Sequence, residues 1–121
     1  MNIKQASQQS GLSVDTIRFY EKCGMLPKIG RDTRGWRLFT PDVLNWLETL
    51  ERLRATGMPL KSVRRFAVLV HTEQAGREAQ EERLQILLSH SQQLKRRRSE
   101  LDACETYLAH KIKVYQKETS S

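Results

Sequence analysis

The chain is short, basic and rich in charge. It has 121 residues, of which 38% are hydrophobic and 29% charged, and its formal net charge is +7. This composition suits a small core joined to a long solvated segment. No apolar run approaches the roughly 20 residues of a membrane span, and the N-terminus lacks a signal-peptide core. We therefore expect a cytoplasmic protein with no membrane partner.

The positive charge is concentrated in the first part of the chain. Residues 1–75 hold 12 Lys and Arg against 7 Asp and Glu, whereas residues 76–121 hold 9 against 7. A basic excess of this kind favours a polyanionic partner, and nucleic acid is the first candidate. The alternative is a soluble protein whose basic composition serves no partner.

A helix-turn-helix is predicted at the start of the chain. Residues 4–10 should form a short helix, and Gly11-Leu12 provides a tight turn with one buried leucine. Ser13 is a suitable N-cap for a second helix, whose apolar set includes Ile17. Two short helices joined by a glycine-containing turn form the expected unit.

A hairpin and two further helices are predicted next. In residues 28–40, apolar and basic residues alternate around a Gly/Asp/Thr turn, which is typical of a two-stranded wing. Its outward-facing arginines are expected to be Arg31, Arg34 and Arg37. Thr40-Pro41 then begins a helix, with Thr40 as the N-cap and the proline at the first helical position. A break at residues 57–59 separates that helix from another with its own apolar stripe.

From about residue 80 the apolar positions repeat every seven residues, which is typical of a coiled coil. The seam consists of Leu87, Leu94, Leu101, Leu108 and Tyr115, which lie seven residues apart, with Leu84 and Ile112 out of phase with this series near its two ends. The complementary positions in its middle are polar, namely Ser91, Arg98 and Glu105. A lone helix of roughly 35–40 residues cannot bury this stripe by itself, so we expect it to pair with a second copy of the chain.

Several motifs near the N-terminus carry a family resemblance. They are Gly11-Leu12-Ser13, Thr16-Ile17-Arg18-Phe19-Tyr20-Glu21, Gly24-Met25-Leu26 and Gly35-Trp36-Arg37-Leu38-Phe39. Together they resemble the DNA-binding domain of the MerR family of transcription regulators, in a short form without an effector domain. Residues 53–60 resemble the second wing of that family, and the trailing helix resembles its dimerisation helix.

The resemblance implies a fold class and a division of the chain. The fold is mostly α, with a small β-hairpin wing. Residues 1–75 would form a winged helix-turn-helix DNA-binding domain. Residues 76–121 would form a dimerisation helix and tail, which pairs with its copy as an antiparallel coiled coil.

The resemblance also implies a function. The chain would bind an inverted-repeat promoter site on double-stranded DNA as a homodimer and distort it, with RNA polymerase as a further partner at the promoter. Such distortion uses deformation energy in place of base contacts. The alternative is an architectural or excisionase-like DNA-bending protein built on the same winged helix.

The resemblance implies a set of DNA-contacting residues. They are Val14, Asp15, Thr16, Arg18 and Tyr20 on the second helix, and Arg31, Arg34, Trp36, Arg37 and Lys61 in the wings. Arg37 is the strongest candidate for a phosphate contact. Structural roles are the alternative for three of them: Asp15 favours a helix N-terminus, Arg18 is a solvated charge, and Tyr20 is a core aromatic. Phe39, where the family often has tyrosine, is expected in the core.

Cysteine usage argues against several sensing mechanisms. The chain has only Cys23 and Cys104, whereas a soft-metal sensor needs two or three thiolates around one ion and an iron–sulfur site about four. The sequence has no Gly-rich phosphate loop, nucleophile motif or paired carboxylates. We therefore expect no catalytic residues, no enzymatic activity, no metal and no cofactor. Modification of a single thiol stays open.

Overall fold

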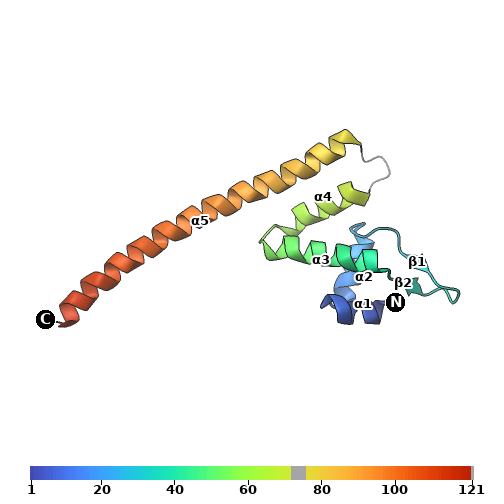
Figure 1. Cartoon of the computed structure of the whole chain (residues 1–121), viewed down its shortest axis with the longest axis horizontal. Coiled ribbons are helices and arrows are strands. Elements are labelled where there is room, and N and C mark those ends of the chain that lie inside the picture. Colours follow the sequence, from blue (N-terminus) through green and yellow to red (C-terminus); the bar gives the residue numbers. More distant parts are fainter. Residues whose placement is uncertain (72–75, 121) are drawn as a thin grey trace. The chain divides into compact units, whose positions relative to one another are not determined.

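The computed structural model describes residues 1–71 and 76–120 and is mainly helical (Figure 1). Its elements are α1 (Ile3–Ser10), α2 (Val14–Lys22), β1 (Gly30–Arg31), β2 (Arg37–Leu38), α3 (Pro41–Ala55), α4 (Leu60–His71) and α5 (Arg77–Ser120). The chain divides into two compact units, Met1–Ile86 and Leu87–Ser121. The predicted fold class, helical with one small hairpin and a long C-terminal helix, is confirmed.

The first two helices are defined by their caps. The Asn2 side chain accepts a hydrogen bond from the Gln5 amide at 2.8 Å, and the Asn2 amide donates to the Gln5 side chain at 3.0 Å. Gly11 ends α1 with a φ of 78°, in the left-handed region that favours glycine. Ser13 then caps α2 by accepting from the Thr16 amide at 3.0 Å. The predicted helix-turn-helix is confirmed.

The predicted wing and the start of the next helix are also confirmed. β1 and β2 are antiparallel, with Gly30 opposite Leu38 and Arg31 opposite Arg37. The Thr40 side chain caps α3 by accepting a backbone amide hydrogen bond at 3.3 Å, and a proline follows at the first turn. The hairpin is therefore anchored directly at the N-terminus of α3.

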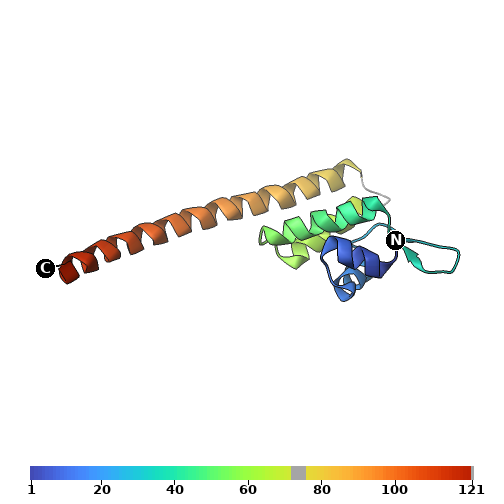
Figure 2. The same cartoon turned by 60° about the horizontal axis from the view of Figure 1, so that its bottom comes forward.

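One hydrophobic core holds the first unit together. Its largest fully buried side chains are Ile17, Met25, Phe39, Leu47, Leu50 and Val63. α1 packs against α2 and α3, and α3 packs against α4, as the two views in Figures 1 and 2 agree. The indole Nε1 of Trp46 donates to the Met25 carbonyl at 2.7 Å, which ties α3 to the segment after α2. The core position expected for Phe39 is confirmed, since it is 1% exposed.

The first turns of α5 belong to the first unit. Arg65 on α4 donates two hydrogen bonds to the Glu82 carboxylate, at 2.8 and 3.0 Å. Arg83 donates to a carbonyl of α4 at 3.1 Å, and Ile86 packs against the core. These contacts explain why the first compact unit extends to Ile86. The predicted domain boundary after residue 75 adjoins residues outside the described structure, and it stays a prediction.

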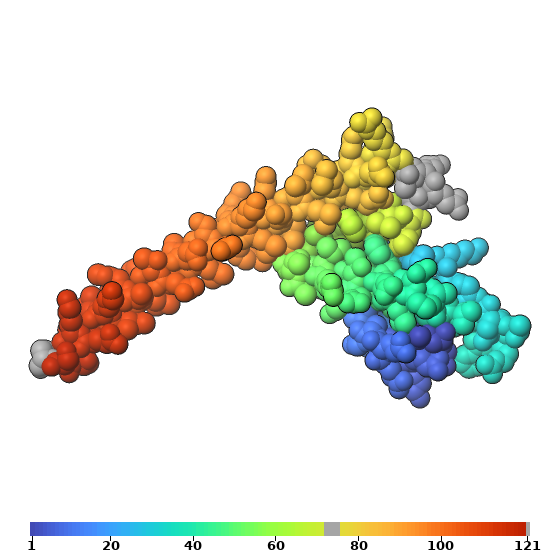
Figure 3. All heavy atoms as spheres, viewed as in Figure 1, coloured from blue at the N-terminus to red at the C-terminus, as the bar shows by residue number. Residues whose placement is uncertain are grey.

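The described part of the second unit is a single helix, the continuation of α5, and Figure 3 draws its side chains as spheres. The seam residues predicted from the heptad pattern, of which Leu84 belongs to the first unit and the others to the second, are all exposed in the single chain, from 37% for Leu94 to 61% for Tyr115. Exposed leucines at this spacing are what a helix presents before a partner covers them. Within residues 1–71 and 76–120, no helix is long and apolar enough to cross a membrane.

His71, at the end of α4, gives the first unit a pH dependence. Its ring packs edge-on against Trp46, with centroids 4.7 Å apart, and its buried Nε2 has no hydrogen-bond partner among the described residues. Burial lowers the pKa of His71 below its usual 6.5. The unfolded chain therefore binds the proton more readily, so the free energy of unfolding should fall as the pH drops from 6.5 towards the lowered pKa.

Replacing this histidine should remove part of that pH dependence. We expect His71→Leu to lose less stability than the wild type between about pH 6.5 and pH 5, because it has no proton to take up on unfolding. Urea unfolding followed at several pH values measures the difference. Equal losses in the two proteins would contradict the assignment to His71.

Candidate nucleic-acid interface

A basic concavity lies between the start of α1, α2 and the wing. It has a volume of about 430 Å³ and is lined by Asn2, Ile3, Lys4, Arg18, Arg31, Arg34, Gly35, Trp36 and Arg37. Five of these residues are cations and none is an anion. The helix-turn-helix and the hairpin, which are separate in sequence, thus present one positive surface suited to a polyanion.

The α2 side of this surface is provided by Arg18. Arg18 and Asp15 are exposed and point away from the core, whereas Val14 and Thr16 are half-buried. The Thr16 hydroxyl lies 2.8 Å from that of Ser13, within hydrogen-bond distance. The exposed side chains of α2 are therefore those that a groove edge or a phosphate would meet first.

Tyr20 is the one buried member of the predicted contact set. Three positions after Ile17, it shares the inward face of α2, and its side chain is only 5% exposed. Burial raises the pKa of Tyr20, with a further contribution from the carboxylate of Glu51. This burial favours the core role for Tyr20, and its contact with DNA stays a prediction.

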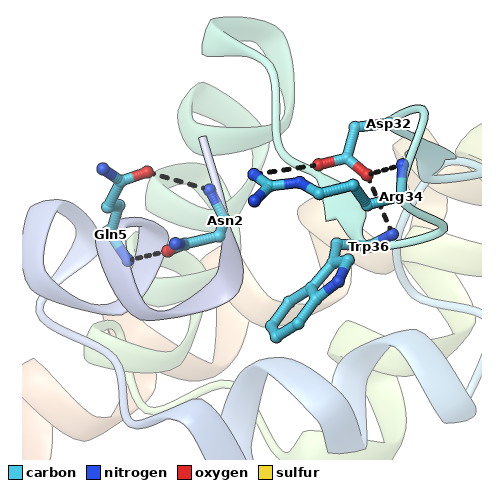
Figure 4. Close-up of polar contacts among 5 residues, drawn as sticks. All are labelled: Asn2, Gln5, Asp32, Arg34 and Trp36. Carbon is cyan, nitrogen blue, oxygen red and sulfur yellow. Dashed lines mark hydrogen bonds and ion pairs between the residues drawn. The ribbon is translucent and has the colours of Figure 1, made fainter.

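The tip of the wing is built around Asp32 (Figure 4). Its Oδ1 accepts hydrogen bonds from the amides of Arg34, at 2.9 Å, and Trp36, at 3.0 Å. The Gly35 amide donates to the Asp32 carbonyl at 3.0 Å, and Gly35 has a φ of 80°, which a residue with a side chain rarely adopts. The amide of Trp36, and then that of Arg34, lower the pKa of Asp32.

Removing the Asp32 carboxylate should loosen this turn. In Asp32→Ala we expect the amides of Arg34 and Trp36 to exchange with deuterium about tenfold faster, because both lose their acceptor. Asp32→Asn keeps an acceptor oxygen and should exchange nearly as slowly as the wild type. In the wild type the protection should hold above pH 3.8 and be lost as the pH falls through the lowered pKa. Equal exchange in both variants would contradict this role.

The outer side chains of the wing are strongly exposed. Arg31 donates through Nη1 to the Gly35 carbonyl at 2.8 Å and so bridges the turn. The Arg34 side chain is 82% exposed, and Trp36 is 64% exposed. A tryptophan left in solvent between arginines offers a flat apolar face with an indole N–H donor, which suits contact with a sugar–phosphate backbone.

Arg37 is held differently from the other arginines. We expected it to face outward, but it is half-buried and faces Glu21 in the last turn of α2. Its Nε donates to Glu21 Oε1 at 3.0 Å. The ion pair joins the wing to the helix-turn-helix, and Arg37 still lines the basic concavity.

The structure gathers only part of the predicted set. The predicted residues that line the basic concavity together are Arg18, Arg31, Arg34, Trp36 and Arg37. Lys61 is exposed in the first turn of α4 but does not line it. Lys4, which sequence reasoning missed, does line it. A lysine in the first turn of a helix is an ordinary surface residue by pattern, and only the packing of α1 beside the wing distinguishes it.

The family-level comparison agrees with this geometry. Residues 1–67, more than half of the chain, match a family model described as MerR HTH family regulatory protein. The chain belongs to the MerR family. A relative from Haemophilus influenzae, named as an uncharacterized HTH-type transcriptional regulator, is 39% identical over 113 residues, which cover 93% of this chain and 82% of the relative.

Two solved MerR-family structures match this chain over most of its length. A regulator from Listeria monocytogenes has a TM-score of 0.77 and 32% identity, covering 96% of this chain and 86% of its own. HiNmlR, a MerR family regulator lacking the sensor domain, was solved bound to promoter DNA. It has a TM-score of 0.74 and 37% identity, covering 98% of this chain and 92% of its own. The likeness therefore includes the long helix as well as the first unit.

The two cysteines of this MerR-family chain are free thiols in different settings. Cys23 is half-buried at the end of α2, and Cys104 is exposed on α5. Among residues 1–71 and 76–120, no group of three or more His, Cys, Asp and Glu side chains could hold a metal ion. Absence of a metal and of a cofactor stays an expectation.

Proposed function

We propose that this MerR-family regulator binds an inverted-repeat site in promoter DNA as a homodimer and controls transcription by distorting that site. The observation that carries the proposal is the basic concavity, which unites α2 and the wing in one cationic surface. HiNmlR, a MerR family regulator that is 37% identical to this chain, was solved bound to promoter DNA. Because the relatives are named as transcriptional regulators, the proposal includes no catalytic activity.

The proposed contacts divide by chemistry. The side chains on α2, namely Val14, Asp15, Thr16 and Arg18, would meet base edges and phosphates of one major groove. The wing residues Arg31, Arg34, Trp36 and Arg37 would bind the flanking backbone, and Lys61 a second backbone segment. Lys4 joins this set because it lines the same concavity as Arg18.

The proposed dimer follows from the exposed seam of α5. Leucines at heptad spacing, left uncovered in the single chain, would be buried by a second copy in an antiparallel coiled coil. Such a pair has two-fold symmetry, and its two DNA-binding units would then match two half-sites of an inverted repeat. This is why the dimer and the symmetry of the site belong to one proposal.

The proposed regulation works through DNA shape. A dimer that grips two half-sites can bend and untwist the DNA between them, at an energy that depends on the sequence deformed. At a promoter this would change how RNA polymerase meets its recognition elements. The alternative is an architectural DNA-bending protein. It would bind and bend DNA through the same surface but would not prefer one promoter.

Competition binding tests the proposal and separates it from this alternative. The probe is a duplex that the wild-type protein selects from a random-sequence library, and the competitor is an unrelated duplex of the same length. We expect the unrelated duplex to compete at least about 1,000-fold less well, with affinity that falls steeply as salt rises. Equal competition by the two duplexes would overturn the regulator and favour the architectural protein.

A further inference from the structure

An acidic residue stands beside the proposed DNA surface. Glu21 lies in the last turn of α2, and its carboxylate is directed at Arg37 on β2. A carboxylate close to phosphates should weaken DNA binding by repulsion. Its presence next to the cationic surface therefore needs a reason.

The geometry of the pair supplies that reason. Arg37 Nε donates to Glu21 Oε1 at 3.0 Å, and it also lies 2.9 Å from Oε2, which is buried and accepts no hydrogen bond of its own. The carboxylate thus contacts the guanidinium through its inner nitrogen. Within residues 1–71 and 76–120, the terminal nitrogens Nη1 and Nη2 of Arg37 form no hydrogen bond, and Arg37 lines the basic concavity.

An arginine is suited to this double task. Its planar guanidinium has five N–H donors in a rigid fork, so one edge can bind a carboxylate while the other binds a phosphate. A free arginine side chain has several rotatable bonds, and ordering it on DNA costs conformational entropy. A partner that orders the side chain beforehand removes part of this cost from the binding step.

We propose that Glu21 is a positioning residue for DNA binding: it holds Arg37 by Nε so that Nη1 and Nη2 face a phosphate in the basic concavity. The inference rests on the proposed function, because it assumes that DNA occupies this surface. It also assigns the ion pair a second effect, since α2 and the wing then approach DNA as one rigid element. Neither role follows from the charge of Glu21 alone.

Whether substitution of Glu21 weakens or strengthens DNA binding distinguishes a positioning role from an effect of its charge alone. If Glu21 acts only through its charge, then Glu21→Gln and Glu21→Met both bind DNA more tightly than the wild type. If it positions Arg37, Glu21→Met binds about five- to tenfold more weakly, because it has no acceptor for Nε. Glu21→Gln keeps an acceptor oxygen and loses the repulsive charge, so it should bind at least as tightly as the wild type.

With a lysine at position 37, the change Glu21→Met should strengthen DNA binding instead of weakening it. Arg37→Lys has one cationic head, which Glu21 would hold away from the phosphate, so this variant should bind weakly. Adding Glu21→Met to Arg37→Lys frees the ammonium and should strengthen binding. The same Glu21→Met change therefore weakens binding with arginine and strengthens it with lysine, an outcome that a general loss of stability does not produce.

The experiment measures affinity and its salt dependence on a duplex that the wild-type protein selects from a random-sequence library. We expect Glu21→Met to reduce the slope of log affinity against log salt by about 0.9, the value for one lost phosphate contact. Glu48→Met on α3 is the matched control, since Glu48 also pairs with an arginine, Arg52, at 2.9 Å. Glu48→Met should leave the slope of log affinity against log salt unchanged. Thermal unfolding of each variant verifies that it is folded.

The outcomes separate the inference from the proposed function. If the wild type selects no sequence and shows no salt-dependent binding, the proposed function fails. If the wild type binds as proposed, but Glu21→Met binds equally well or better with an unchanged slope, only the positioning role is overturned. The same holds if Glu21→Met weakens binding equally in the arginine and lysine backgrounds.

Discussion

Replacing Leu101 with aspartate should convert the dimer to a monomer and weaken specific DNA binding by at least about 100-fold. Leu101 lies in the α5 seam and is 58% exposed in the single chain. In the dimer, the substituted carboxylate would replace a leucine at the contact with the partner helix, where removing a charge from water costs several kcal/mol. A monomer has one DNA-binding unit and loses the second half-site. Analytical ultracentrifugation and fluorescence anisotropy with a selected duplex measure the two effects.

Ala103→Asp is the control for that experiment. Ala103 lies two residues further along α5 but outside the heptad seam, and it is also exposed. The change places the same charge and a similar helix penalty on the same helix, without entering the predicted dimer contact. It should remain dimeric and bind DNA like the wild type. If Leu101→Asp and Ala103→Asp both became monomeric, or if both stayed dimeric, the claim that the heptad seam forms the dimer contact would be contradicted.

Replacing Phe39 with alanine should lower the free energy of unfolding by about 3–5 kcal/mol, the usual cost of truncating a buried phenylalanine. Phe39 is 1% exposed and lies between the wing and α3. Its amide also donates to the Met1 carbonyl at 2.7 Å, so the base of the wing and the start of the chain meet here. The loss is a large part of the stability expected of a small domain. Urea unfolding measures it.

Leu38→Ala is the matched control for Phe39. Leu38 precedes it on β2 but is 43% exposed, so little apolar surface is lost from the core. We expect a change below about 1 kcal/mol. Similar losses for the two variants would show that the wing base is not part of the core.

The elements of the fold could be predicted because their signals are local. Ser13 and Thr40 precede apolar helical patterns and cap their helices as expected. Gly11 marks the turn between the first two helices, where a positive φ is needed. The heptad seam is equally local, since its spacing alone defines one face of a helix.

The candidate site was less predictable because it depends on packing between elements. Tyr20 is one of two aromatic residues on α2, with Phe19, and whether it faces the core or solvent depends on how the helix is rotated against α3. The ion pair of Arg37 with Glu21 joins residues that lie 16 positions apart, so no local pattern reveals it. Lys4 joins the basic concavity only because α1 packs beside the wing.

The symmetry of the DNA site tests the central claim most directly. The full chain is incubated with a random-sequence duplex library, and the bound duplexes are recovered and sequenced. A homodimer that holds DNA with two copies of α2 and the wing should enrich an inverted repeat, with half-sites separated by about one helical turn or a multiple of it. Enrichment of a single unrepeated half-site, or of no sequence at all, would contradict the claim that the chain binds an inverted repeat as a homodimer.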